Sequence, residues 1–280
     1  QLVQEVGELI GEDAMWAGYA GFYGSGLNIH RTPYAGRVFE YYSEDGILTG
    51  LIDTAETIGI QSKGVYVYNK HFALNEQEMQ RQGLGTWCNE QAMREIYLRA
   101  FELPIVNADA KCVMTAFNRI GAVWSGACDE LLTDWLRGEA GMEGFAVTDM
   151  YEGDYMSKPH EVLAGNDIPD NFPGTTGTGG TNSTTGDLGF EFADYGPDGA
   201  TPNAAIARAM RESAHRILYT VLHSRGMDGF SADTQIVSVT PWWQMALNVA
   251  TITLAVLSVL SVVLLVADML PRKKEKQAEH

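Results

Sequence analysis

Short apolar runs alternate with helical stretches through the first 165 residues, and this alternation limits the possible folds more than any other feature. The runs typical of strands are GVYVY at 64–68, KCVMTAF at 111–117 and GFAVT at 144–148. The helical stretches between them cover residues 47–59, 89–102 and 129–139. Strands that alternate with helices in this way form a parallel sheet covered by helices. The sequence therefore predicts an α/β fold.

Polar residues of catalytic type follow each predicted strand. Lys70 and His71 come after the first strand, Asn118 ends the second, and Asp149 follows the third. In a (β/α)8 barrel, the active site is built at the C-terminal ends of several strands at once. Residues 28–45 add arginines, acids and aromatics after a short apolar lead, which is typical of a strand with a long active-site loop. We therefore predict a TIM-like barrel with these side chains at one end.

The charge of the chain limits its partners. The formal net charge is -17, and the basic tail beyond residue 269 makes the remainder more acidic still. Such a surface repels phosphate backbones, so nucleic-acid binding is excluded and a neutral substrate is favoured. The three cysteines form no CxxC pair and have no histidine at metal-ligand spacing. We expect neither a metal site nor a cofactor.

Near the C-terminus, residues 245–267 form an uncharged run of 23 residues. At about 1.5 Å per residue, this run is long enough to cross a hydrocarbon core of roughly 30 Å. Trp242 and Trp243 precede it, and the basic cluster 272–274 follows it. A buried core helix is the alternative, but the length, the absence of charge and the asymmetric flanks favour a membrane span.

These flanks predict a topology. Positive charge stays on the cytoplasmic side, so we expect a single-pass cell-membrane protein with an extracellular catalytic part. The transmembrane helix covers 244–268, and 269–280 form a cytoplasmic basic tail. The lipid bilayer is thus an expected partner.

The remaining boundaries follow from composition. A stretch rich in Gly, Thr and Asn (173–187) cannot bury a core, and we predict a flexible loop over 171–200. An amphipathic helix follows at 204–226, with Gly226 placed to end it. The folded domain then covers 1–226, and a linker covers 227–243.

Five sequence blocks resemble the signature blocks of glycoside hydrolase family 3, in the same order and with similar separations, over roughly residues 8–225. They are NIHRTPYAGRVFEYYSED, KHFALNEQEMQR, VMTAFNRIG, LLTDWLRGEAGMEGFAVTD and LAGNDI. The resemblance implies a (β/α)8-like catalytic barrel that acts with an α/β sandwich domain. It also implies an enzyme that releases β-linked glucose or a related sugar from the non-reducing end, with retention of configuration. The text KHFALNEQ disfavours the β-N-acetylhexosaminidase branch, which carries KHFPGHG.

The resemblance assigns roles to individual residues. Asp149 matches the nucleophile, and a retaining mechanism needs such a carboxylate on a rigid strand end below the anomeric carbon. Lys70 and His71 match the pair that holds sugar hydroxyls, and Arg37 matches the arginine of the GR motif. An arginine fork with lysine and histidine donors suits the several hydroxyls on one face of a sugar ring.

Three further positions match the walls of the sugar subsite. They are Met114, Phe117 and Met150. Phe117 stands where many family members have tyrosine, and Met150 replaces the tryptophan that commonly follows the nucleophile. The second difference removes an aromatic face for sugar stacking. Nearby acids (Glu40, Glu44 and Asp45) are interpreted as structural, and Arg81 as a residue that braces the site.

A retaining mechanism needs a second carboxyl group about 5–5.5 Å from the nucleophile. The resemblance implies that this acid/base residue comes from the sandwich domain, which the 280 residues do not contain. The family's DGP-type block is also missing. We therefore expect the first barrel strands and the sandwich domain to lie upstream, so that the chain is a C-terminal portion of the enzyme. Glu152 and Asp154 lie near Asp149 in sequence, but nothing in the sequence gives them a role.

Two other functions stay open at this point. The first is a non-catalytic carbohydrate-binding cell-surface protein on a decayed barrel, which the joint presence of Asp149, Lys70, His71 and Arg37 disfavours. The second is another (β/α)8 enzyme, such as a metal-dependent hydrolase. That class needs His/Asp clusters at ligand spacing, which six scattered histidines do not supply.

Overall fold

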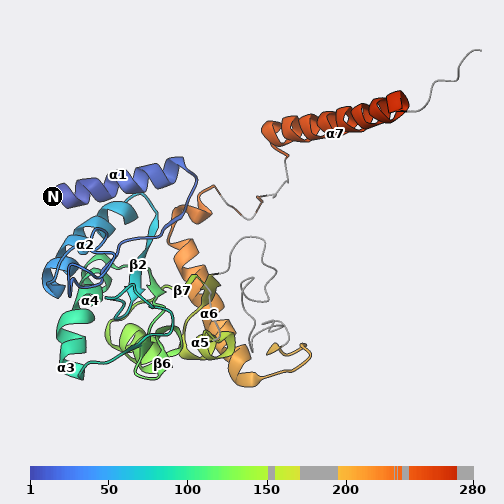
Figure 1. Cartoon of the computed structure of the whole chain (residues 1–280). Coiled ribbons are helices and arrows are strands. Elements are labelled where there is room, and N and C mark those ends of the chain that lie inside the picture. Colours follow the sequence, from blue (N-terminus) through green and yellow to red (C-terminus); the bar gives the residue numbers. More distant parts are fainter. Residues whose placement is uncertain (151–154, 171–194, 230, 232, 235–239, 270–280) are drawn as a thin grey trace, which may run out of the picture. The chain divides into compact units, whose positions relative to one another are not determined.

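The computed structural model divides the chain into two compact units, Gln1–Gly229 and Phe230–His280 (Figure 1). It describes residues 1–150, 155–170, 195–229, 231, 233–234 and 240–269. Most of the predicted loop 171–200, half of the linker 227–243 and nearly all of the basic tail 269–280 lie outside these residues. Glu152 and Asp154 lie outside them as well.

Among the described residues, the first unit is built on a five-stranded sheet in the order β1-β2-β4-β7-β8. Its strands are β1 (Gly21–Phe22), β2 (Tyr66–Phe72), β4 (Cys112–Thr115), β7 (Ala146–Met150) and β8 (Ile168–Asp170). Every neighbouring pair is parallel. The predicted α/β class is therefore confirmed, and the sheet is part of a barrel because a closed one has eight strands.

The strand ends differ from the prediction. The first and third predicted strands were expected to end just before Lys70 and Asp149, but β2 and β7 run through these residues. The side chains that we expected beyond the strands are therefore held by the sheet itself. This fixes them more rigidly than a loop would.

Helices cover the sheet. They are α1 (Leu2–Trp16), α2 (Gly46–Gln61), α3 (Glu90–Ala92), α4 (Arg99–Ala108), α5 (Lys158–Ala164) and α6 (Ala204–Leu222). The predicted helix 89–102 is broken by a π-helical turn, η1 (Met93–Tyr97), and the predicted helix 129–139 is π-helical as η3 (Glu130–Glu139). Short 3-10 turns form η2 (Ser125–Ala127) and η5 (Arg225–Met227).

The two faces of the sheet carry different residues because side chains alternate along a strand. On one face, Val113 of β4 and Ala146 of β7 pack with Phe101 of α4 in the main core. On the other face, Met114 and Val147 belong to a second buried cluster. All four residues of β4 are buried, as expected for an inner strand of a parallel sheet with both faces covered.

Helices α1 and α2 lie side by side (Figure 1) and approach closely through glycine. A Cβ atom at Gly59 would lie 2.2 Å from the carbonyl oxygen of Gln4, so only glycine fits there. Asp45 begins α2 by accepting hydrogen bonds from the amides of Ile47 and Leu48.

Helix α6 joins the sheet through a buried ion cluster. Asp167 accepts hydrogen bonds from Arg216 of α6 (2.7 Å) and from Arg137 of η3 (3.0 Å). Its Oδ2 also accepts from the backbone amide of Ala146 at 2.8 Å. The helix ends at Leu222 with His223 as its C-cap, so the prediction that Gly226 ends it was wrong. Gly226 lies in η5 instead, because the backbone turns at Ser224.

A small second sheet lies beside the main one. Among the described residues it has three strands, in the order β3-β5-β6: β3 (Gly85–Thr86), β5 (Arg119–Ile120) and β6 (Val123–Trp124). Residues 28–45 form no long strand. They run as an extended loop, tied to the main sheet by bridges from Gly26 to Tyr41 and Lys70.

In the second unit, the apolar run forms one long helix, α7 (Trp242–Met269). Among the described residues, Trp242–Val266 is long and apolar enough to cross a membrane, with a mean hydropathy of 2.7, and none of it is buried.

Candidate active site

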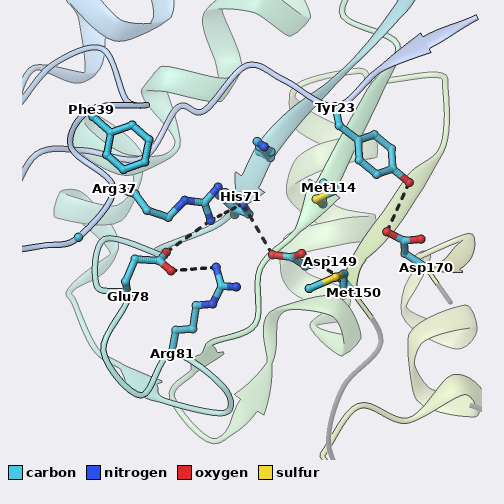
Figure 2. A pocket seen from close by; sticks show the side chains of 12 residues that line it. Tyr23, Arg37, Phe39, His71, Glu78, Arg81, Met114, Asp149, Met150 and Asp170 are labelled. Atoms are coloured by element: carbon cyan, nitrogen blue, oxygen red, sulfur yellow. Dashed lines mark hydrogen bonds and ion pairs between the residues drawn. The ribbon is translucent and has the colours of Figure 1, made fainter. Parts of the chain in front are cut away.

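A cavity of about 680 Å³ opens where β2, β4, β7 and β8 end (Figure 2). Its lining includes six of the seven predicted site residues: Arg37, Lys70, His71, Met114, Asp149 and Met150. Side-chain alternation accounts for this. Residues 70, 114 and 149 share the parity of the second buried cluster, so the three strands present them on the same face. The sheet thus brings together groups that lie up to 112 residues apart.

Asp149 has one carboxylate oxygen bound and one free. Its Oδ1 accepts a hydrogen bond from the amide of Met150 at 2.9 Å, whereas its buried Oδ2 has no hydrogen-bond partner among the described residues. Burial raises the pKa of Asp149 above its usual value, and the Met150 amide and the positive charge of Arg81 oppose that rise. A rigid carboxylate with one desolvated, unpaired oxygen is suited to attack an electrophile.

His71 is neutral and has a defined tautomer. Arg37 can only donate, and its Nη1 lies 3.0 Å from Nε2 of His71, so Nε2 accepts. The proton is therefore on Nδ1, which lies 3.2 Å from the side-chain oxygen of Asn28. Burial lowers the pKa of His71 well below its usual value, and the charges of Arg37 and Lys70 lower it further. The 3.7 Å approach of Nε2 to Asp149 is thus between two acceptors and is not an ion pair.

Charged residues on one side of the pocket are held in an ion-pair network. Glu40 pairs with Arg37 at 2.7 Å and with Lys70 at 3.0 Å. Glu78 pairs with Arg81 at 2.9 Å and reaches Arg37 at 3.5 Å. These acids fix the two arginines and the lysine in position, and each cation keeps further N–H groups for a ligand.

The loop 28–45 is fixed to β2 by backbone contacts. Asn28 donates to the carbonyl of His71 at 3.1 Å and accepts from the amide of His71 at 2.9 Å. Before Arg37, Gly36 adopts a φ of +99°, and a Cβ atom there would lie 2.9 Å from Cβ of Glu78. Glycine thus lets the chain turn so that the arginine enters the pocket.

The sequence matches a known family over this region. Residues 1–164 match the family described as Glycosyl hydrolase family 3 N terminal domain. The chain belongs to this family. It is 38% identical over 181 residues to the probable beta-glucosidase I of Aspergillus oryzae, which covers 65% of this chain and 21% of that protein. It is 41% identical over 165 residues to beta-glucosidase A of Butyrivibrio fibrisolvens (59% of this chain, 20% of that protein).

Solved structures of family 3 proteins have the same fold. Beta-glucosidase 3B from Thermotoga neapolitana in complex with glycerol aligns with a TM-score of 0.72 and 33% identity, over 82% of this chain and 31% of that one. The family 3 beta-glucosidase of Bifidobacterium adolescentis aligns with a TM-score of 0.69 and 32% identity, over 85% of this chain and 32% of that one. The chain spans about one fifth of the length of the curated relatives that it matches.

Two predicted positions of this family 3 chain lie behind the pocket. Phe117, predicted as a wall residue, is fully buried and packs with Trp124 and Met156. The Arg81 guanidinium covers its ring at 4.5 Å, so it supports the pocket through Arg81. Asn118 is also buried, and it donates to the carbonyl of Ala73 at 3.0 Å.

Four lining residues of the family 3 pocket were not predicted. They are Tyr23, Phe39, Glu78 and Asp170. Asp170 ends β8 directly after the block LAGNDI, so the strand-end rule that found Asp149 could also have found it. Glu78 lies within KHFALNEQEMQR, but no charge pattern in that block sets it apart. Tyr23 and Phe39 carried no signal, since aromatic residues in a loop are common.

Proposed function

We propose that this chain carries the nucleophile-bearing part of a retaining, exo-acting β-glycosidase of the β-glucosidase type. The observation that carries the proposal is the unpaired Oδ2 of Asp149, buried at the end of β7 in a pocket with Lys70, His71 and Arg37. The substrate class is a neutral β-glucoside or β-linked oligosaccharide. The names of the related beta-glucosidases support this class.

The chemistry has two steps. Oδ2 of Asp149 attacks C1 of the terminal sugar, the bond from C1 to the leaving oxygen breaks, and that oxygen receives a proton from a general acid. Water then hydrolyses the glycosyl-enzyme, and the same residue takes the proton from water. Lys70 and Arg37 donate hydrogen bonds to the sugar hydroxyls, and Nε2 of His71 is an acceptor. Met114 and Met150 form apolar walls.

The shape of the site supports exo action. The lining residues come from β2, β4, β7, β8 and the loop before α2, so they surround a cavity of a volume suited to one sugar unit. A terminal residue of a chain fits such a cavity.

The acid/base residue of this proposal belongs to an α/β sandwich domain, and the earlier barrel strands belong with it. The size of the relatives supports this, since the chain covers only 31% of the Thermotoga protein. Within the pocket, Glu78 is engaged by two arginines and cannot readily give or take a proton.

Trapping with 2,4-dinitrophenyl 2-deoxy-2-fluoro-β-glucoside tests the proposal. Dinitrophenolate leaves without protonation, so the first step needs the nucleophile but no general acid. We expect intact-mass analysis to show one fluoroglucosyl adduct, which peptide mapping locates at Asp149. Asp149→Asn should show none, and Asp134→Asn, a matched change at an exposed residue, should label like the wild type. A carbohydrate-binding protein would bind glucose without acquiring the adduct, and that result would reject the enzyme.

We further propose that α7 anchors the chain in the cell membrane as a single span, with the first unit outside and the C-terminus in the cytoplasm. The uncharged, fully exposed window Trp242–Val266 and the basic residues 272–274 support this topology. In cells, the full chain should stay with membranes after carbonate washing, and protease added outside should cleave the first unit. A chain that ends at residue 241 and stays in the washed membranes would contradict the anchor.

A further inference from the structure

A second carboxylate, Asp170, lines the pocket at the end of β8. The backbone holds it firmly. Asp170 is paired in register with Met150 of β7, and its amide donates to the hydroxyl of Thr148 at 2.8 Å. Its side chain lies on the side of Asp149 that faces away from Arg37, Glu78 and Arg81 (Figure 2).

The partner of Asp170 comes from the other end of the sheet. Tyr23 follows β1, and its hydroxyl donates to Oδ2 of Asp170 at 3.4 Å. β1 and β8 are the two end strands of the sheet order, so this hydrogen bond joins residues from opposite ends across the pocket. The Tyr23 ring packs edge-on against Tyr68 of β2, with centroids 4.6 Å apart, which limits its movement. The pair thus forms a wall built from two fixed side chains.

The charge of Asp170 is poorly compensated. Among the described residues no lysine, arginine or histidine forms an ion pair with it, whereas Glu78 in the same pocket has two arginines. Asp170 is also half-buried, and burial raises its pKa above the usual value. A partly desolvated carboxylate with one neutral hydrogen-bond donor gains from further donors. Sugar hydroxyls supply such donors without adding a charge.

We propose that Asp170 and Tyr23 form a hydroxyl-recognition pair that sets the sugar specificity of the pocket. Asp170 accepts a hydrogen bond from one hydroxyl of the bound sugar, and Tyr23 holds the carboxylate in place. The cationic side of the pocket donates hydrogen bonds to the sugar, and this side accepts them. The pair therefore selects a neutral sugar unit with a free hydroxyl at this position. This inference rests on the proposed function, because it assumes that the pocket binds a sugar.

Binding of glucose and its 2-, 3-, 4- and 6-deoxy analogues to the full chain in detergent, measured by calorimetry, tests the pair. In the wild type, one deoxy analogue should bind more weakly than glucose by about 10- to 100-fold, the range for a hydrogen bond to a charged acceptor. In Asp170→Asn, glucose should weaken by about tenfold or more, and the penalty for that analogue should fall below about threefold. Tyr23→Phe should show a smaller loss in the same direction, and Asp134→Asn should bind like the wild type.

The outcomes separate this inference from the function. Wild-type binding without any deoxy penalty above about threefold, or Asp170→Asn binding within about twofold of the wild type for every sugar, would overturn the pair. Absence of glucose binding by the wild type would overturn it too. Should Asp170→Asn not fold, as judged by circular dichroism, Tyr23→Phe decides by the same criteria at a threshold of about twofold. A chain that binds glucose through Asp170 but is not labelled at Asp149 retains the pair and loses the enzyme.

Discussion

Arg37 donates from Nη1 to Nε2 of His71 at 3.0 Å, and this contact makes the imidazole a hydrogen-bond acceptor beside the candidate nucleophile. His71 therefore cannot protonate Asp149 or pair with it, although the two side chains approach to 3.7 Å. An acceptor here leaves Oδ2 of Asp149 without a bound proton donor. The arginine thus controls the reactivity of the carboxylate through the histidine.

Replacing Arg37 with methionine should raise the pKa of His71, because the substitution removes both the donor to Nε2 and a nearby positive charge. The protonated imidazole would then pair with Asp149 and reduce its nucleophilicity. We expect NMR titration to show the higher pKa and fluoroglucoside labelling to slow by about tenfold or more. Arg99→Met, at a partly exposed arginine paired with Glu102, is the control. An unchanged pKa of His71 would contradict the role of the arginine.

Asp53 should make the stability of the fold depend on pH. It is fully buried, with Oδ2 bound by Asn69 at 2.7 Å and Oδ1 without a partner among the described residues. Burial raises its pKa from 3.8 to about 7. The folded state therefore holds a proton that the unfolded state has lost between about pH 4 and pH 7, so the free energy of unfolding falls as pH rises through this window.

Asp53→Asn should flatten that fall. The expected difference in slope accumulates to a few kcal/mol between pH 4 and pH 8, since a pKa difference of one corresponds to about 1.4 kcal/mol. Urea denaturation of the full chain in detergent at several pH values measures it. Parallel curves for the variant and the wild type would show that Asp53 does not carry this dependence.

Asp167 should be essential for stability. It is bound by two arginines and a backbone amide, and its side chain is fully buried. Asp167→Asn removes the negative charge and leaves Arg137 and Arg216 uncompensated, which should lower the free energy of unfolding by about 3–5 kcal/mol. Asp129→Asn, a matched change at an aspartate outside this cluster, should cost less than about 0.5 kcal/mol. Denaturation midpoints compare them, and equal losses would remove the cluster from the account of stability.

A charge in the middle of α7 should weaken membrane insertion. Val259→Arg places an arginine near the centre of the apolar window, at a cost of about 2.5–3.5 kcal/mol. Gln244→Arg, at the helix end, lets the side chain reach the interface and should have little effect. The carbonate-resistant fraction in cells reports both. Equal retention of the two variants would argue against a span.

The sequence predicted the class of the fold and most of the pocket because both depend on local patterns. Apolar runs such as 144–148 mark inner strands, and the parallel sheet places their C-terminal ends together. The same logic located Lys70, His71 and Asp149. Spacing alone did not predict the depth of a side chain. Phe117 lies behind Arg81 because the chain turns into β5 just after it, and this turn depends on contacts that are distant in sequence.

The contact between Tyr23 and Asp170 was equally out of reach. These residues are 147 positions apart, and their meeting depends on how the sheet curves between its two end strands. The pattern of one strand carries no information about that curvature. The π-helical turns of η1 and η3 were missed for a similar reason, since helical periodicity over ten residues does not distinguish them from α-helix.

β7 is an interior strand, paired with β4 on one side and with β8 on the other. The position of the Asp149 carboxylate is therefore determined twice, by neighbours that belong to the same 60-residue stretch of chain. Additions or exchanges at the margins of the sheet can alter which molecules reach the cavity without displacing that oxygen. Such an arrangement gives a protein engineer a stationary reactive atom around which the borders can be redesigned.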